Sequence, residues 1–235
     1  MPRAVLAALL VGLYTTVFGV ACLASALLDR RGRWPHACVR LWGRLLARSF
    51  GIQVRVEGAG HVPAGPAVFA ANHVSAADIP IVFGFLPFEF RIIHKKSLSL
   101  VPLVGWCLAL GGHIAIDRSN AFRARRSLTT AVERVRNGVS VVVFPEGTRS
   151  PDGSVGLFKR GSFTLALNAG VPVVPVSIVG VRQVMPRGLG SLRSGKVVLR
   201  LHPPIPTSGR SADAAEALAD EVRGAVIRGC QEVFA

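Results

Sequence analysis

The chain has 235 residues, of which 50% are hydrophobic, and its formal net charge is +15 at pH 7. This length can bury one sizeable core. The strong positive charge indicates an anionic partner, either a nucleic acid or an acidic membrane surface. With one Tyr and no RNA-binding signature, a stacking platform for bases has little support, so we expect a membrane partner and no nucleic acid. The cysteines lack CxxC spacing and the histidines lack an HExxH pattern, so we expect no metal and no other cofactor.

A segment of 25 residues without a charge, Ala4 to Leu28, lies near the amino terminus. As a helix it would measure about 37 Å, enough to cross a hydrocarbon core of about 30 Å. More arginines follow the segment than precede it. The positive-inside rule then places the rest of the chain on the cytoplasmic face of the cell membrane. Two alternatives stay open, a signal peptide cleaved near residues 21–24 and a hairpin that enters one leaflet without crossing it.

The next segment, His36 to Phe50, has the pattern of a basic amphipathic helix. Arg40, Arg44 and Arg48 recur every four residues and form one stripe, and an apolar surface that includes Trp42 accompanies them. We expect this helix to lie at an anionic membrane interface. Ordinary packing against the domain is the alternative. Residues 1–50 are thus predicted to anchor the chain to a membrane.

The remaining residues, 51–235, alternate between strand-like and helix-like stretches. This alternation predicts a single layered α/β domain with a mostly parallel or mixed central sheet flanked by helices. We expect Lys196 to Leu201 to be an edge strand and Ser211 to cap a terminal helix. The other expected strands span residues 52–57, 67–71, 113–117, 139–144 and 171–179, and the expected helices span residues 97–110 (with a break at Pro102), 122–136, 161–168 and a segment that begins near 78–80.

A compact motif, Asn72-His-Val-Ser-Ala-Ala-Asp78, directly follows one of these strands. On a regular helix, positions five apart point about 140° away from each other, so His73 must lie in the turn before the helix and Asp78 must reach back to it. Asp78 would then fix the tautomer of the ring and leave the other ring nitrogen to take a proton from a substrate hydroxyl. Ser75 has no GxSxG elbow around it and is interpreted as a turn residue. The alternative is a capped helix start without chemistry.

A second charged motif, Phe144-Pro-Glu-Gly-Thr-Arg149, follows another strand-like stretch. The carboxyl edge of an α/β sheet is where such folds form their ligand crevice. The guanidinium of Arg149 matches the geometry of a phosphate, and Gly147 permits close approach of the backbone. Glu146 is suited to orient either Arg149 or a substrate hydroxyl. The alternative is a surface turn with an ion pair that contributes little.

In this order and spacing, the two motifs resemble those of the glycerolipid acyltransferases that make phosphatidic acid from lysophosphatidic acid, the 1-acyl-sn-glycerol-3-phosphate acyltransferase family with its HxxxxD motif. The resemblance covers roughly residues 55 to 180. It is specific for the superfamily and less specific for the substrate. It extends to Lys95-Lys96-Ser-Leu, Pro102-x-x-Gly105, Ile116-Asp-Arg118, Phe158-Lys-Arg-Gly161 and Val171-Pro-Val-Val-Pro175.

The resemblance implies that His73 is the general base for the acceptor hydroxyl and that Asp78 orients it. It implies transfer of a fatty acyl group from acyl-CoA or acyl carrier protein to the sn-2 hydroxyl of 1-acylglycerol 3-phosphate, by an acyltransferase domain at residues 51–235. Apolar residues around Leu98 to Leu110 would then line an acyl channel, unless they form an ordinary core helix. The expected substrate-binding residues are Lys95, Lys96, Arg118, Glu146, Gly147, Thr148 and Arg149.

Other functions stay open at this point. The acceptor can be another lyso-lipid, such as a lyso-ornithine lipid, or glycerol 3-phosphate itself. A hydrolase is a further alternative, in which His73 activates water. A peripheral membrane or nucleic-acid-binding module would need none of the motif side chains for chemistry. The agreement of several motifs argues against such a module.

Overall fold

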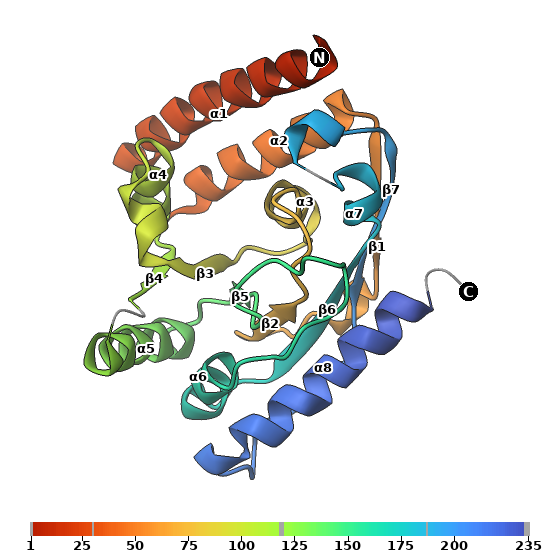
Figure 1. Cartoon of the computed structure of the whole chain (residues 1–235). Coiled ribbons are helices and arrows are strands. Elements are labelled where there is room, and N and C mark those ends of the chain that lie inside the picture. Colours follow the sequence, from red (N-terminus) through yellow and green to blue (C-terminus); the bar gives the residue numbers. More distant parts are fainter. Residues whose placement is uncertain (1, 30, 118–119, 187, 233–235) are drawn as a thin grey trace.

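The computed structural model describes residues 2–29, 31–117, 120–186 and 188–232. In this part of the chain, seven strands form one sheet in the order β1-β7-β6-β2-β5-β3-β4 (Figure 1). Neighbouring strands are parallel, except that β6 and β7 are antiparallel. The expected α/β class with a mixed central sheet is therefore confirmed. The strands are β1 (Ile52–Glu57), β2 (Val68–Ala71), β3 (Arg91–Lys95), β4 (Ile114–Ile116), β5 (Val141–Val143), β6 (Val173–Val179) and β7 (Gly195–Leu201).

Helices cover both faces of the sheet (Figure 1). Side chains alternate between the faces along a strand, so the neighbours Val68 and Phe69 of β2 belong to two different cores. One core lies under α2 (Arg33–Ser49) and α3 (Asp78–Phe85), and the other lies under α5 (Ala121–Arg136), α6 (Gly161–Ala169) and α8 (Ala215–Gln231). Because β2, β5 and β6 are buried on both faces, they are apolar without alternation, as central parallel strands are.

Two short helices and four 3₁₀ turns make the remaining connections. They are α4 (Val104–Leu110), α7 (Val181–Val184), η1 (Ala59–His61), η2 (Lys96–Leu100), η3 (Leu189–Ser191) and η4 (Ala212–Ala214). The predicted helix 97–110 is thus divided between η2 and α4, with Pro102 at the division, as expected. Ser211 precedes η4 and makes no side-chain cap hydrogen bond, so its expected capping role is wrong.

The apolar amino-terminal helix, α1 (Pro2–Leu28), packs along α2 (Figure 1, red and orange). The hydroxyl of Tyr14 lies 3.1 Å from Ser49 Oγ, and the indole N–H of Trp42 donates to Thr15 Oγ1 at 3.3 Å. Residues 4–28 have a mean hydropathy of 2.2 in their most apolar window, of which only 11% is buried. One side of α1 therefore contacts the domain. The other side presents an apolar surface, and the helix is long enough to cross the hydrocarbon core of a membrane.

The arginine stripe of α2 does not face outward as predicted. The guanidinium of Arg40 donates to the carbonyl oxygens of Leu86 and Phe88, and Arg44 Nε donates to Gly84 O at 2.8 Å. These carbonyls lie at or just beyond the end of α3, where a helix leaves its last C=O groups without helical partners. Two of the three arginines thus satisfy the backbone of α3, and they are not available to an anionic interface.

The backbones of α2 and α3 also approach each other closely. A Cβ added to Gly43 would collide with the carbonyl of Pro80, and one added to Gly84 would lie 3.0 Å from the backbone nitrogen of Arg44. Both positions need glycine because the two backbones approach too closely for any side chain. The helices are therefore held by shape as well as by the arginine hydrogen bonds.

Two strands differ from the sequence predictions. β7 was expected at an edge, but it lies between β1 and β6, and its inward residues, such as Leu199, are completely buried. β3 was not predicted at all. Its sequence Arg-Ile-Ile-His-Lys carries three ionisable residues, and two of them, Arg91 and His94, are nevertheless buried. Arg91 is accommodated because it donates to Glu89 and to backbone carbonyls.

A buried histidine of α2, His36, lies against the aromatic rings of Phe83 and Phe90, at centroid distances of 6.0 and 5.0 Å. Burial, together with the nearby positive charges of Arg40 and Arg91, lowers the pKa of His36 to about 4. The imidazole is therefore neutral in the folded protein at neutral pH. In the unfolded chain the same group titrates at its ordinary value of 6.5.

We predict that stability falls as the pH drops from 6.5 towards 4, because the unfolded chain then binds a proton at His36 that the folded protein does not bind. At pH 5 this linkage costs about 2 kcal/mol. Thermal unfolding in detergent at pH 7.5 and pH 5 measures it. His36→Leu should show a smaller loss in Tm over this range than the wild type, and an equal loss would contradict the assignment.

Candidate active site

The segments that follow β2, β5, β3 and β4 meet at one edge of the sheet. These four strands are mutually parallel neighbours, so their carboxyl ends lie together. His73 follows β2, Glu146 follows β5, Lys96 follows β3 and Asp117 follows β4. Such an edge is where α/β sheets form ligand sites. The topology therefore gathers both sequence motifs and the basic middle segment at one place.

The predicted contact between His73 and Asp78 is present. His73 Nδ1 lies 2.7 Å from Asp78 Oδ2, and the same oxygen accepts the backbone N–H groups of Val74 and Ser75 at 2.8 Å each. Asp78 is completely buried at the first position of α3. Ser75 Oγ accepts the backbone N–H of Ala77, as expected for a turn residue. The histidine lies in the turn and the aspartate reaches back to it, which is the geometry that the spacing requires.

This arrangement leaves one ring nitrogen of His73 for chemistry. The carboxylate of Asp78 fixes the orientation and the tautomer of the imidazole through Nδ1. The ring stacks against Phe144, with a centroid distance of 4.4 Å, and its side chain stays 17% exposed. Within the described part of the chain, no hydrogen bond involves Nε2. An oriented imidazole with an accessible nitrogen has the geometry that general-base chemistry requires.

Glu146 binds backbone groups in the structure, which bears on only one of its two predicted roles, the orientation of Arg149. Its Oε1 accepts the backbone N–H of His73 at 2.8 Å, and its Oε2 accepts the backbone N–H of Gly156 at 3.2 Å. Burial raises the pKa of Glu146, while these two N–H donors lower it. No ion pair joins Glu146 to Arg149 among the described residues. Glu146 thus ties three loop segments together and holds the backbone of His73, and it does not orient Arg149.

Asn72, which carried no predicted role, positions the same loop from the other side. Its amide group donates to Ile178 O at 3.0 Å, and its carbonyl oxygen accepts the backbone N–H of Ile178 at 2.7 Å. The side chain continues the pairing of β2 with β6 after the β2 backbone has turned away. His73 O also accepts the backbone N–H of Ser150 at 2.8 Å. The only sequence signal for this role was the place of Asn72 at the end of a strand.

The expected cationic and loop residues divide into two groups. Thr148, Arg149 and Lys95 are exposed, and neither basic side chain forms a hydrogen bond or ion pair within the described residues. Lys96, by contrast, donates to Asp117 at 3.0 Å. Gly147 has φ 75°, a backbone conformation that disfavours any side chain. The turn therefore needs glycine at this position.

One predicted residue, Arg118, lies outside the described residues. Two further exposed cations at the same edge, Lys159 and Arg160, were noted only as part of a motif. The backbone N–H of Lys159 donates to Pro145 O at 3.0 Å, which places this residue beside the second motif. The exposed cations at the edge are thus more numerous than the sequence argument assigned.

An apolar cavity of about 260 Å³ lies beside the site. Ile79, the residue after Asp78, forms part of its wall. The predicted apolar segment contributes Leu98, Leu103, Val104, Cys107 and Leu108. The remaining lining side chains come from α1, α2, α3 and the adjoining sheet: Thr15, Phe18, Gly19, Cys22, Val39, Trp42, Phe83, Ile92 and His113. The cavity is therefore enclosed between the amino-terminal helices and α4, and it suits an apolar chain.

Comparison with known proteins finds relatives across most of the chain. Residues 53–179 match the family model described as Acyltransferase. The chloroplastic 1-acyl-sn-glycerol-3-phosphate acyltransferase of Brassica napus is 35% identical over 204 residues, which are 85% of this chain and 57% of that protein. The human 1-acyl-sn-glycerol-3-phosphate acyltransferase alpha is 36% identical over 186 residues, 78% of this chain and 66% of that protein. The chain thus spans about three fifths of the length of these curated relatives.

A solved structure covers nearly the whole chain. The crystal structure of the 1-acyl-sn-glycerophosphate acyltransferase PlsC from Thermotoga maritima superposes with a TM-score of 0.79 and 33% sequence identity. The match covers 97% of this chain and 96% of the other. The likeness therefore includes the amino-terminal helices as well as the sheet.

We predict that Asn72→Ala lowers Tm by roughly 5–10 °C, because the N–H and C=O groups of Ile178 lose their partners in a buried place. Asn168→Ala, a matched change on an exposed position of α6, should alter Tm by less than about 2 °C. Thermal unfolding of both variants in the same detergent makes the comparison. Equal shifts would show that the Asn72 hydrogen bonds contribute nothing specific.

Proposed function

The chain belongs to the acyltransferase family, and on this premise we propose that it transfers a fatty acyl group to the sn-2 hydroxyl of 1-acylglycerol 3-phosphate. The donor is a thioester, either acyl-CoA or acyl carrier protein, and the product is phosphatidic acid. The contact between His73 and Asp78 carries the proposal. It provides a base but no protein nucleophile, since Ser75 is engaged in the turn. The attacking group must then come from the substrate.

The geometry supports direct transfer. Nε2 of His73 takes the proton of the acceptor hydroxyl while the hydroxyl oxygen forms a bond to the thioester carbonyl carbon. The C–S bond of the tetrahedral intermediate then breaks, and the proton passes from His73 to the leaving thiolate. Asp78 stabilises the imidazolium that exists between these steps. No acyl group is ever attached to the protein.

The phosphate of the acceptor needs cations near the base. Arg149 and Lys95 are exposed at the edge of the sheet where His73 lies, and neither is neutralised by a described partner. The guanidinium of Arg149 can bind two phosphate oxygens at once. We assign the phosphate to these two residues. Lys96 instead fixes the segment after β3 through Asp117, and Glu146 acts as a positioning residue through the backbone of His73.

The apolar cavity supports an acyl chain as part of the substrate. Its lining is almost entirely hydrocarbon and sulfur, and it begins next to α3, whose first residue is Asp78. A fatty chain placed there would bring its thioester end towards the base. The cavity wall includes α1, so the amino-terminal helix is part of the enzyme as well as a candidate anchor.

The membrane association that we propose uses α1 in contact with the domain. α1 touches α2 through Thr15, α4 through Gly19 and η3 near its own amino terminus. A helix packed along its length in this way would carry the domain with it into the bilayer core if it stood upright. We therefore favour a hairpin of α1 and α2 that enters one leaflet. The basic residues Arg31 and Arg33 beyond α1 support the cytoplasmic leaflet, whose anionic lipids attract basic side chains.

One prediction from the proposed function concerns the general base, His73. His73→Ala should lower turnover by about 10³-fold, the loss expected for a removed general base, with an unchanged circular dichroism spectrum. Thiol release from oleoyl-CoA, with and without lysophosphatidic acid in anionic vesicles, measures turnover. His61→Ala, which removes an exposed histidine elsewhere, should retain it. Thiol release that does not need the acceptor would indicate a thioesterase. Undiminished release by His73→Ala would show that His73 is not the general base.

Another prediction concerns the binding of the acceptor phosphate by Arg149. Arg149→Ala should raise the KM for lysophosphatidic acid by roughly 10- to 100-fold, because one charge-assisted contact is lost, while the KM for the donor stays unchanged. Arg228→Ala, an exposed arginine on α8, is the matched control. An uncharged lyso-lipid acceptor should be insensitive to the Arg149 change. If both KM values rise together, Arg149 binds the donor and the phosphate assignment fails.

A further inference from the structure

The exposed hydrophobic side chains are confined to one part of the molecule. Large hydrophobic residues with high exposure lie on α1, α2, the segment from Leu98 to Phe122, and at Leu157. None lies between residues 158 and 232 within the described chain. Outside α1, the three most exposed are Leu100 (81%), Leu157 (77%) and Phe122 (75%). A monomeric soluble surface rarely gathers such residues on one side.

These three side chains lie on segments that follow strands of the edge where the candidate active site lies. Leu100 ends η2, which directly follows β3, and Phe122 lies in the first turn of α5, which follows β4. Leu157 follows β5 and is held in place by its neighbours, since Gly156 donates to Glu146 and Lys159 donates to Pro145. Each one thus extends from a segment at the carboxyl edge of the sheet. We name Leu100, Phe122 and Leu157 the apolar rim.

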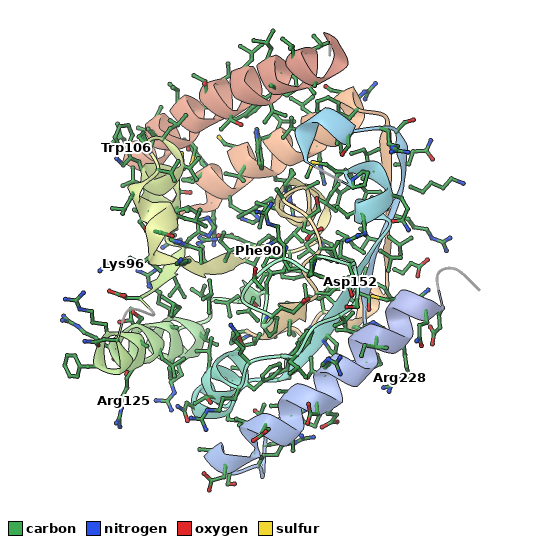
Figure 2. All side chains as sticks on the ribbon, in the orientation of Figure 1. Phe90, Lys96, Trp106, Arg125, Asp152 and Arg228 are labelled. Carbon is green, nitrogen blue, oxygen red and sulfur yellow. The ribbon has the colours of Figure 1, made fainter. Side chains whose placement is uncertain are left out.

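Cations accompany every member of the apolar rim. Lys96 lies on the same 3₁₀ turn as Leu100, Arg123 and Arg125 lie on the same helix as Phe122, and Lys159 lies two residues from Leu157. Lys96 and Arg123 share one carboxylate, that of Asp117, so this group of cations keeps a net positive charge. Figure 2 shows Trp106, Lys96 and Arg125 along one side of the molecule, on α4, η2 and α5. Exposed apolar tips flanked by lysine and arginine are the composition of surfaces that enter the headgroup layer of anionic membranes. The stripe of α2 cannot supply these charges, because Arg40 and Arg44 are bound to carbonyls.

We propose that the apolar rim is a second membrane-contact surface, distinct from α1, which docks on an anionic lipid surface and holds the mouth of the site in the headgroup layer. α4 links it to α1, because Cys107 contacts Gly19 and Trp106 is exposed beside it. An acceptor lipid then reaches His73 without leaving the bilayer. The proposal rests on the proposed function in one respect, that the acceptor is a lipid.

Depth in the membrane tests the contact without any need for activity. The full chain, with its four cysteines replaced by alanine, receives a fluorescent thiol label at Phe122→Cys or, as the control, at Arg228→Cys. It is reconstituted in vesicles of phosphatidylcholine and phosphatidylglycerol whose acyl chains carry bromine. The label at 122 should lose about half its fluorescence and the label at 228 almost none, because bromine quenches only at short range and a docked surface is buried about 5–10 Å. No quenching at 122 overturns the proposal.

Kinetics then test what the contact does. The triple variant Leu100→Ser, Phe122→Ser, Leu157→Ser should turn over lysophosphatidic acid in vesicles about tenfold more slowly, yet keep within about twofold its rate on a monomeric short-chain lysophosphatidate in solution. Arg125→Glu should lose the stimulation by phosphatidylglycerol, and Arg228→Glu should keep it. An equal loss on both acceptors overturns the proposal, because the rim then serves the fold or the site.

Two further outcomes separate the alternatives. A loss seen only with acyl carrier protein as donor, and not with acyl-CoA, would assign the surface to the carrier and overturn the membrane contact. A wild type that is inactive on both acceptors would defeat the proposed function. The quenching result would still decide whether the apolar rim enters the membrane.

Discussion

One carboxylate oxygen organises the site. Asp78 Oδ2 accepts the ring N–H of His73 and two backbone N–H groups, in a place that water does not reach. The aspartate therefore holds the turn closed and orients the imidazole. Because Asp78 is the first residue of α3, the position of that helix decides where the oxygen lies. The orientation of the His73 imidazole is consequently a result of how α3 packs between the sheet and α2.

Around this contact the polar side chains divide into buried ones that bind the backbone and exposed ones that stay unpaired among the described residues. Asn72 and Glu146 are buried, and their polar atoms bind backbone groups of neighbouring segments. Arg149 and Lys95 are exposed and unpaired among the described residues. Such a site keeps its geometry without a ligand, and the positive charges of Arg149 and Lys95 are not used to stabilise it. The loop that carries His73 loses its conformational entropy when the protein folds, so substrate binding does not have to offset that loss.

Much of this arrangement was readable in the sequence because it follows from local rules. The central strands are continuous apolar stretches, and the spacing of His73 and Asp78 permits contact only through a turn. β3 was missed because its ionisable side chains hide a buried strand, and burial depends on partners that are distant in the chain, such as Arg31 O for Arg91. Periodicity likewise could not distinguish a stripe that faces lipid from one that faces helix carbonyls. The neighbours Lys95 and Lys96 differ only in whether Asp117 is within reach, which no spacing reveals. The roles of the motif residues came from the resemblance to a family.

The crossing of α2 and α3 at Gly43 and Gly84 has a consequence for how the protein can be handled and how it can evolve. The amino-terminal segment is not a detachable tether. Removing residues 1–50 would strip the cover from Ile81 and Phe83 and leave the last carbonyls of α3 without the arginines that bind them. A truncated, freely soluble form would therefore lack one wall of its core and of its apolar cavity. The proposed attachment to lipid and the packing of the core therefore depend on the same two-helix segment, because α1 packs along the α2 that covers α3.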